Sequence, residues 1–272
     1  MVKRDYLFKF NANLIFEDEP MQRVRIEFPG SLSYNLSASL DAPDDENPQA
    51  YALFAHCFTC TKNLRAIHNI NKELTSHKIA VLRFDFTGLG ESEGDFADTN
   101  FSSNVGDLVA AAEFLKKNYQ GPKILIGHSL GGAAVLQAAG EIPEIKAVST
   151  IAAPFDPAHV SRLLVSKIEE IEQKGVAEIN LAGSTFKIKK QFLNDLEQRH
   201  MQKMIERLQC ALLIFHGPFD NIVGIDNAAS IFAVAKHPKS FISLDEADHL
   251  LMKEEDSLYV GKMVATWASK YI

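Results

Sequence analysis

The 272-residue sequence predicts an α/β protein with a mostly parallel central sheet, antiparallel strands at its N-terminal end and helices on both faces. Two segments of alternating hydrophobicity near the N-terminus predict the antiparallel strands. From residue 51 onward, short apolar runs alternate with longer segments of helical spacing, which is typical of a parallel sheet covered by helices. A hydrophobic content of 46% is enough to fill one large core.

The first two strands are expected at residues 23–28 and 32–40, with a turn at 29–31 between them and a polar loop at 41–48 after them. The later apolar runs are continuous, as expected of strands that are buried on both faces. These runs and the segments between them predict strands at 51–57, 79–84, 123–126, 147–151, 211–215 and 240–244, and helices at 63–77, 101–119, 130–140, 225–235 and 251–271.

The alternation of strands and helices stops between residues 155 and 208. This stretch predicts two or more helices, at about 157–174 and 188–208, joined by an irregular piece at 175–186. We expect no strong strand between Ala152 and Ala211. The predicted organisation is a core formed by residues 1–154 and 209–272 with a small helical cap insertion at 155–208.

The charge and hydropathy patterns exclude several classes of partner. The formal net charge is −7 and no Lys/Arg cluster stands out, which argues against a nucleic-acid partner. The short basic run at residues 187–190 is interpreted as the solvated start of a helix. No apolar stretch approaches the roughly 20 residues that span a bilayer. Lys9 and Asn11 interrupt any signal-like segment, so we expect a cytoplasmic protein without a membrane partner.

The most specific motif is Gly127-His-Ser129-Leu-Gly131, between a predicted strand and a predicted helix. At a sharp strand-to-helix turn the backbone is strained, and side chains two residues before and after the turn would collide, so glycine is required there. A serine hydroxyl becomes nucleophilic when a base takes its proton and an acid orients that base. Ser129 is therefore the predicted catalytic nucleophile.

The acid and the base are expected after two later strands. Asp220 follows the strand at 211–215, and His249 follows the strand at 240–244. Both loops open at the edge of the sheet where ligands bind in open α/β folds. The order Ser, Asp, His is the one that the strand-turn-helix motif requires. Asp220 is therefore predicted to orient His249, and His249 to act as the base.

Several neighbouring residues are candidates for the same roles. Asp226 and Asp245 are alternative acids, whereas Asp248 adjoins His249 and cannot easily face its ring. His216 precedes every late acid and is interpreted as a packed histidine at a strand end.

A tetrahedral intermediate needs two backbone N–H donors. One is expected from Leu130, the residue after the nucleophile, and the other from the loop that follows the strand at 51–55. The Phe58 amide is the predicted second donor, with Cys57 as the alternative. Cys57 and Cys60 then need no role beyond belonging to this loop.

No metal and no organic cofactor are expected. Three cysteines are an odd number, which argues against a disulfide framework. Cys57-x-x-Cys60 could supply two ligands of a zinc site, but the sequence has no second pair of ligands to complete it. A redox role would require a thioredoxin-like sequence context, which is missing. The glycines at 88–94 follow a strand, but the third glycine is one residue late, no helix starts there and acidic neighbours would repel a pyrophosphate.

Four segments resemble the α/β-hydrolase superfamily of serine esterases: Arg83-Phe-Asp-Phe-Thr-Gly-Leu-Gly-Glu-Ser-Glu-Gly, Gly-His-Ser-Leu-Gly-Gly, His-Gly-x-x-Asp and Ala-Asp-His-Leu-Leu. Two more, beginning Ala55-His-Cys-Phe-Thr-Cys and Ala235-Lys-His-Pro, resemble the hydrolase part of bifunctional α/β-hydrolase/OsmC-family proteins. The resemblance covers about residues 20–272 and implies the α/β-hydrolase fold. Such relatives carry a fused OsmC-like domain that is absent here, and its peroxide-reducing activity is not transferred.

The predicted reaction is hydrolysis of small to medium acyl or aryl carboxylic esters through an acyl-enzyme, with a small-molecule ester as the partner. A thioesterase or peptidase would use the same three residues. A non-catalytic binding protein and a redox module built on Cys57 and Cys60 are the alternatives from other classes. The oligomeric state is left open, with a homodimer as one alternative. Apolar residues of the cap are expected to line the substrate pocket, namely Phe155, Leu163, Leu164, Ile168, Phe186, Phe192 and Leu193.

Overall fold

The structure is a computed structural model that describes residues 21–44, 47–181, 183–198 and 200–272. The expectation that the N-terminus carries no signal-like segment falls on residues 1–20 and lies outside the described residues. The same holds for residues 45–46 of the expected polar loop.

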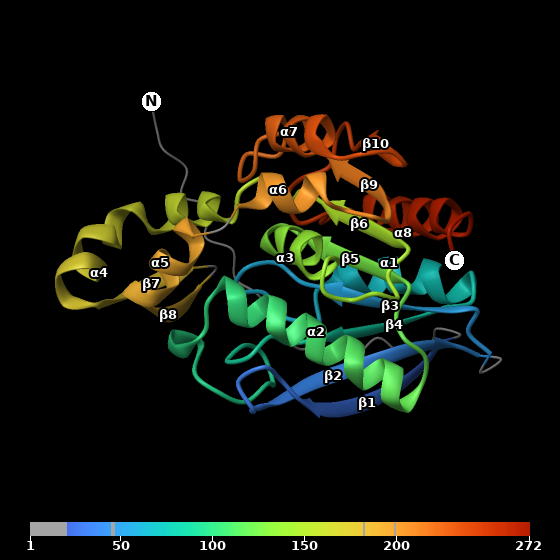
Figure 1. Ribbon diagram of the computed structural model, residues 1–272, viewed down its shortest axis with the longest axis horizontal. Helices are drawn as coiled ribbons and strands as arrows, with labels where there is room; N and C mark the ends of the chain where they lie inside the picture. Colours follow the sequence, from blue (N-terminus) through green and yellow to red (C-terminus); the bar gives the residue numbers. More distant parts are fainter. Residues whose placement is uncertain (1–20, 45–46, 182, 199) are drawn as a thin grey trace.

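An eight-stranded sheet in the described part of the chain has the order β1-β2-β4-β3-β5-β6-β9-β10 (Figure 1). β1 pairs antiparallel with β2, and β2 antiparallel with β4, while all further pairs are parallel. The prediction of a mostly parallel sheet with N-terminal antiparallel strands is confirmed. The strands are β1 (Met21–Pro29), β2 (Asn35–Pro43), β3 (Ala50–Ala55), β4 (Ile79–Phe84), β5 (Ile124–His128), β6 (Ala147–Ile151), β9 (Ala211–His216) and β10 (Lys239–Ser243).

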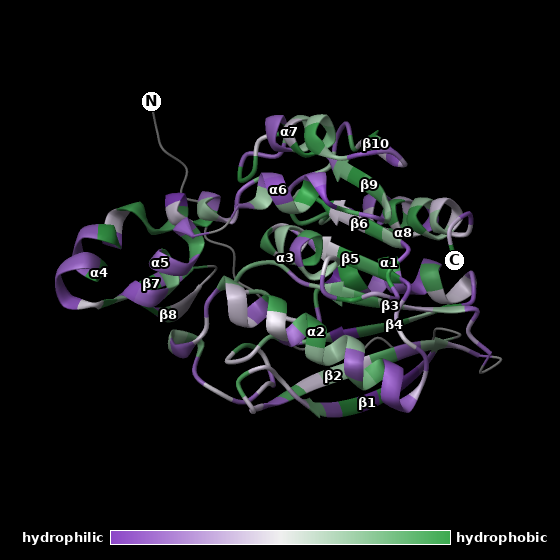
Figure 2. Ribbon diagram, in the orientation of Figure 1, coloured by the Kyte–Doolittle hydropathy of each residue, from purple (hydrophilic) through white to green (hydrophobic). Residues whose placement is uncertain are grey.

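Helices cover both faces of this sheet. On one face, α1 (Arg65–Ser76) packs with α8 (Glu254–Ala268) over a core that includes Ile70 and Val264. The helices of the other face share a second core with the opposite side of the strands; they are α2 (Phe101–Asn118), α3 (Leu130–Ala138), α6 (Met201–Glu206) and α7 (Asp226–Val234). The central strands are largely hydrophobic in Figure 2, as their burial on both faces requires.

The segment between β6 and β9 differs from its prediction. It begins with the 3₁₀ helix η2 (Pro157–Lys167) and α4 (Ile168–Lys174), and then forms an antiparallel hairpin of β7 (Val176–Leu181) and β8 (Ser184–Lys189). The expectation of no strong strand between Ala152 and Ala211 is wrong, since β7 and β8 lie there. In β7, buried Ala177 and Ile179 alternate with exposed polar residues, which is the pattern of a strand with one solvated face.

The expected long helix at 188–208 is two helices, α5 (Lys190–Glu197) and α6. The basic run at 187–190 lies at the end of β8 and at the first residue of α5, so most of it is strand. The cap is therefore a mixed insertion, in which α4, β7, β8 and α5 lie together at one end of the molecule (Figure 1).

A buried charged group ties β1 and β2 to the rest of the sheet. The Asp41 carboxylate, which is fully buried, accepts hydrogen bonds from Arg83 at 2.8 Å, Arg23 at 2.8 Å and Asn71 at 2.9 Å. Burial alone would raise the pKa of Asp41, but the charge and hydrogen bond of Arg83, followed by the charge of Arg23, lower it below its ordinary value. The antiparallel edge of the sheet is thus fastened by a carboxylate that has no access to solvent.

We predict that Asp41→Asn destabilises the protein by about 3–5 kcal/mol, because the variant leaves the Arg83 charge buried without its counter-charge. Urea unfolding at pH 7 measures this loss. The matched control is Glu254→Gln, which breaks the exposed 2.5 Å pair with Arg65 and should cost no more than about 1 kcal/mol. Equal losses in the two variants would contradict the prediction.

Candidate active site

Ser129 occupies the sharp turn between β5 and α3. Its backbone has φ 55° and ψ −124°, a conformation that costs free energy in a residue with a side chain. The Ser129 N–H donates to the carbonyl of Ile151 at the end of β6, at 2.8 Å. This bond holds the strained residue at the carboxyl edge of the sheet, with its side chain at the start of a helix.

The glycines on either side of Ser129 are required by the packing. A Cβ at Gly127 would lie 2.3 Å from the Gly131 carbonyl oxygen, and a Cβ at Gly131 would lie 2.4 Å from the His56 carbonyl oxygen. Neither position has room for a side chain, because both neighbours are backbone atoms. Helix α3 therefore begins in direct contact with the loop that follows β3.

The structure brings Ser129, His249 and Asp220 together from three separate loops. The Oγ atom of Ser129 lies 3.0 Å from Nε2 of His249, and Nδ1 of His249 lies 2.7 Å from Oδ2 of Asp220. All three residues are at most 9% exposed. In this arrangement the Nδ1–H donates to the carboxylate, which leaves Nε2 free to accept the hydroxyl proton of Ser129.

Asp220 is held as a carboxylate. Its Oδ1 atom accepts the backbone N–H groups of Ile222 and Val223, each at 2.9 Å. Burial alone would raise the pKa of Asp220, but hydrogen bonds from His216 and His249 and the charge of His249 lower it well below its ordinary range. The side chain therefore remains an acceptor for His249 across the neutral and mildly acidic pH range.

The other acids considered from the sequence lie elsewhere. Asp226 is the first residue of α7, Asp245 accepts from its neighbour Ser243, and Asp248 accepts the N–H groups of Leu250 and Met252. His216 is a buried histidine, as expected, but it also approaches Asp220 at 3.5 Å and donates from Nε2 to the Val223 carbonyl at 2.7 Å.

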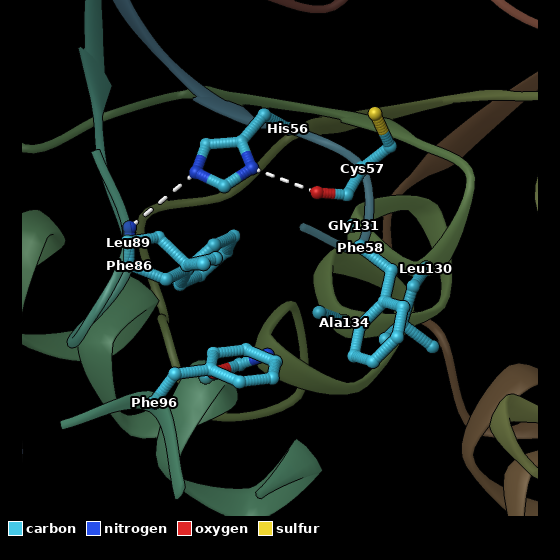
Figure 3. A pocket seen from close by; sticks show the side chains of 10 residues that line it. His56, Cys57, Phe58, Phe86, Leu89, Phe96, Leu130, Gly131 and Ala134 are labelled. Carbon is cyan, nitrogen blue, oxygen red and sulfur yellow. Dashed lines mark hydrogen bonds between the residues drawn. The ribbon is translucent and has the colours of Figure 1, made fainter. Parts of the chain in front are cut away.

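Of the two predicted N–H donors, Leu130 begins α3, and Phe58 lies in the loop after β3, which contacts α3 at Gly131. Leu130 is the first residue of α3, so its N–H has no partner within the helix. Among the described residues, none accepts a hydrogen bond from the N–H of Phe58. The Phe58 and Leu130 side chains line one small cavity together with His56, Phe86, Leu89, Phe96 and Ala134 (Figure 3).

Aromatic rings close this cavity toward the cap. The Phe58 ring packs against Phe96 at 5.7 Å and against Phe192 of α5 at 5.6 Å between ring centroids, and Phe96 packs against Phe186 of β8 at 5.1 Å. Of the cap residues expected to line a pocket, Phe186 and Phe192 therefore contact its wall directly. Leu163 is 43% exposed instead.

Two buried histidines beside Ser129 carry roles that the sequence did not reveal. His128 donates from Nε2 to the carbonyl of His249 at 2.6 Å, and His56 donates from Nδ1 to the carbonyl of Cys57 at 2.9 Å while Nε2 faces the N–H of Phe86 at 3.4 Å. Burial and then the charge of His249 lower the pKa of His128 to about 3, and burial also lowers the pKa of His56. Both rings are neutral near pH 7.

A buried ion pair between Lys62 and Asp85 holds the loop that follows β3. Nζ of Lys62 lies 2.5 Å from Oδ2 of Asp85, and Oδ1 of Asp85 accepts the Lys62 backbone N–H at 2.6 Å. The glycine-rich turn at 88–94 wraps this carboxylate. A Cβ at Gly90 would lie 2.3 Å from it, and the Glu91 N–H donates to it at 3.0 Å. This turn therefore serves packing.

Cys57 and Cys60 form a disulfide. The odd cysteine count argued against a disulfide framework, and that inference does not hold for this pair, because three residues of separation bring the two side chains into bonding range. Cys210 is the free thiol. In the described part of the chain, no group of His, Cys, Asp and Glu side chains is arranged to hold a metal ion, and no helix is long and apolar enough to cross a membrane.

The strand order, the turn at Ser129 and the loops after β9 and β10 define an α/β-hydrolase. A family model described as serine aminopeptidase, S33, matches residues 46–191, which is more than half of the chain. The chain belongs to this family of the α/β-hydrolase superfamily.

Two solved structures and one curated relative illustrate the similarity. The esterase domain of a Rhodothermus marinus protein is 49% identical, with a TM-score of 0.76 over 92% of this chain and 99% of that one. Est1E of Butyrivibrio proteoclasticus with ferulic acid bound has a TM-score of 0.73 over 90% and 98% of the two chains, and at 20% identity it shows the fold alone.

Human palmitoyl-protein thioesterase ABHD10, mitochondrial, is 29% identical over 150 residues, which are 53% of this chain and 48% of that protein. The chain thus spans about half the length of this curated relative. The similar proteins thus include an esterase domain and a thioesterase.

Because His56 and His128 are neutral in the folded protein, we predict that the free energy of unfolding falls as the pH is lowered. An unfolded histidine titrates near pH 6.5, whereas His128 in the folded protein titrates at about 3. Below about pH 6.5 the unfolded state binds protons that the folded state does not, so the free energy of unfolding falls as pH falls, by up to about 1.4 kcal/mol per pH unit for each such histidine.

Urea unfolding between pH 4.5 and 6.5 measures this slope. His128→Gln keeps a donor for the His249 carbonyl but does not titrate, and it should flatten the slope. The control is His159→Gln, which removes a partly exposed ring that donates to the Ile222 carbonyl. A slope that His128→Gln leaves unchanged would contradict the assignment.

Proposed function

We propose that the protein is a serine hydrolase that cleaves small to medium acyl or aryl carboxylic esters through a Ser129–His249–Asp220 triad. The observation that carries the proposal is the unbroken chain of contacts from Oγ of Ser129 through the His249 ring to the Asp220 carboxylate. A hydroxyl, an imidazole and a carboxylate in this order are the groups needed to activate a nucleophile.

In the proposed mechanism, His249 takes the Ser129 proton as Oγ attacks the ester carbonyl. The Phe58 and Leu130 amides stabilise the oxyanion, with Cys57 as the alternative to Phe58. His249 then returns the proton to the leaving alcohol, and an acyl-enzyme remains. Water attacks the acyl-enzyme with His249 again as base, which releases the acid and restores Ser129.

The cavity beside Phe58 and Leu130 is the proposed site of the acyl group. It adjoins both proposed oxyanion donors, and its wall is formed mostly by apolar and aromatic side chains, with His56 and Asn104 as the polar ones. The tilted packing of Phe58, Phe96 and Phe192 limits its depth, which supports short acyl chains or a flat aryl group. Est1E, which shares the fold, has ferulic acid bound, and a ligand with an aromatic ring is consistent with the aryl group proposed here.

Thioester hydrolysis is a second candidate, because the relatives in several mammals are palmitoyl-protein thioesterases and the same triad would serve. Peptide hydrolysis is the third, from the description of the family. A panel of p-nitrophenyl esters of increasing chain length, aryl esters, acyl thioesters and aminoacyl anilides separates the three. The cytoplasmic location stays a prediction.

We predict that Ser129→Ala and His249→Ala each lower kcat for a p-nitrophenyl ester by about 10⁴ or more, and Asp220→Asn by a similar order. Labelling by a fluorophosphonate probe should be lost in Ser129→Ala. Asp245→Asn and Asp226→Asn are the matched controls and should keep near-normal kcat. Near-normal kcat in Asp220→Asn would assign the role of the acid to another residue. Labelling that survives Ser129→Ala would refute the proposal.

We predict that Phe192→Ala shifts the chain-length preference toward longer acyl groups, because it removes a ring that packs on Phe58 over the cavity. The measurement is kcat/KM across the p-nitrophenyl ester series, and a shift toward longer chains at the optimum is expected. Phe114→Ala is the control, because its ring stacks on Phe28 near the far end of α2. An unchanged optimum in Phe192→Ala would place the acyl group elsewhere.

A further inference from the structure

The Cys57–Cys60 disulfide has no part in the mechanism above, yet it closes the loop that carries Phe58. The Cα atoms of the pair are 5.3 Å apart, and Phe58 and Thr59 are the residues between them. This small ring lies directly after β3, beside the first turn of α3. This bond is one residue away from a proposed oxyanion donor.

The loop is held in a conformation that its sequence does not favour. Thr59 has φ 61°, in the left-handed region that a β-branched residue rarely occupies. Two hydrogen bonds to the Cys57 carbonyl accompany it, from Nδ1 of His56 at 2.9 Å and from the Cys60 N–H at 3.1 Å. The disulfide is the covalent bond among the interactions that hold the loop in this conformation.

The two cysteines differ in exposure. Cys57 is 4% exposed, whereas Cys60 is partly exposed. Figure 3 shows the Cys57 side chain directed away from the cavity, while the Phe58 ring points toward Phe96. An external thiolate can therefore reach the bond from the Cys60 side, and Cys57 is placed to leave.

We propose that Cys57–Cys60 is a thiol–disulfide exchange site for low-molecular-weight dithiols, and that the oxidised form is the active one because it holds the Phe58 amide in place. The inference rests on the proposed function and adds a modification site to it. A change at the two cysteines would then act on Ser129 chemistry through the loop backbone.

The exchange balances as two thiolate attacks. One thiolate of the dithiol attacks Sγ of Cys60, the Sγ–Sγ bond breaks, and Cys57 leaves as a thiolate that takes up a proton. The second thiolate of the dithiol attacks the mixed disulfide, which frees Cys60 and yields the oxidised, cyclic disulfide of the reagent. Two electrons pass from the dithiol to the protein, and the oxidised reagent reverses the reaction.

Reduction should lower kcat more than it raises KM. Without the covalent closure, Thr59 can leave the left-handed region, and the Phe58 N–H then moves from its position in the loop. Loss of one oxyanion donor costs about 10²–10³ in kcat, so a partial displacement is expected to cost at least about ten-fold. Substrate binding in the aromatic cavity depends on side chains and should change less.

The test compares kcat for p-nitrophenyl butyrate in the oxidised protein, in protein reduced with dithiothreitol and desalted without oxygen, and in protein reoxidised with the cyclic disulfide of dithiothreitol. Thiol titration in denaturant should count one thiol in the oxidised form and three in the reduced form, as the three cysteines require. We expect the ten-fold or greater loss on reduction and its recovery on reoxidation.

Cysteine variants test whether the effect of reduction on kcat arises at the Cys57–Cys60 loop. Cys57→Ser/Cys60→Ser should have the low kcat of the reduced form and be insensitive to dithiothreitol, while Cys210→Ser should respond like the parent protein. If the double variant does not fold, the reversible treatment of the parent protein still decides. A fully reduced protein with unchanged kcat, or a bond that dithiothreitol does not reduce, would overturn the proposal.

The outcome is distinguishable from failure of the proposed function. An oxidised protein that neither hydrolyses any ester nor reacts with the fluorophosphonate probe contradicts the triad. An oxidised and a reduced protein that hydrolyse the ester equally leave the triad intact and remove the exchange site.

Discussion

The candidate site depends on a close approach of three backbone segments: the end of β5, the first turn of α3 and the loop after β3. Glycine at 127 and 131 permits this approach, since a Cβ at either would overlap a carbonyl group. The strained Ser129 backbone, which costs about 1–3 kcal/mol, is held there by its bond to Ile151. Ser129, His249 and the amides of Phe58 and Leu130 are positioned relative to this contact, so distortion of any one segment would disturb all of them.

Charge is distributed unequally around this contact. The Asp220 side chain is kept ionised by two backbone amides and two histidines, whereas His56 and His128, both buried, are kept neutral. The neutral rings donate to the carbonyls of Cys57 and His249, and each thereby fixes a loop that carries a functional group. The site thus keeps a negative charge beside His249, which is the arrangement that favours proton transfer from a hydroxyl to an imidazole.

Features with a local signal were predictable from sequence, and features made by distant contacts were not. Gly127 to Gly131 forms a turn that depends on nearby residues, and Asp220 and His249 follow strands with clear apolar patterns. By contrast, the bond between His128 and the His249 carbonyl joins residues 121 positions apart. The β7–β8 hairpin was missed although both strands alternate apolar and polar residues, because each is only six residues long and the hairpin lies between segments with helical spacing. The disulfide was missed because an odd cysteine count says nothing about one neighbouring pair.

The cap leaves the sheet after β6 and returns to it at β9, and these two strands are hydrogen-bonded neighbours. The pairing of these strands therefore does not depend on the inserted segment between them. The entropic cost of closing such a segment grows only slowly with its length, by about 0.6 kcal/mol per doubling. A change in the length of this segment therefore leaves the pairing of β6 with β9 in place. Exchange of the segment would alter the wall that Phe186 and Phe192 contribute to the cavity, while the strands that carry Ser129, Asp220 and His249 keep their register.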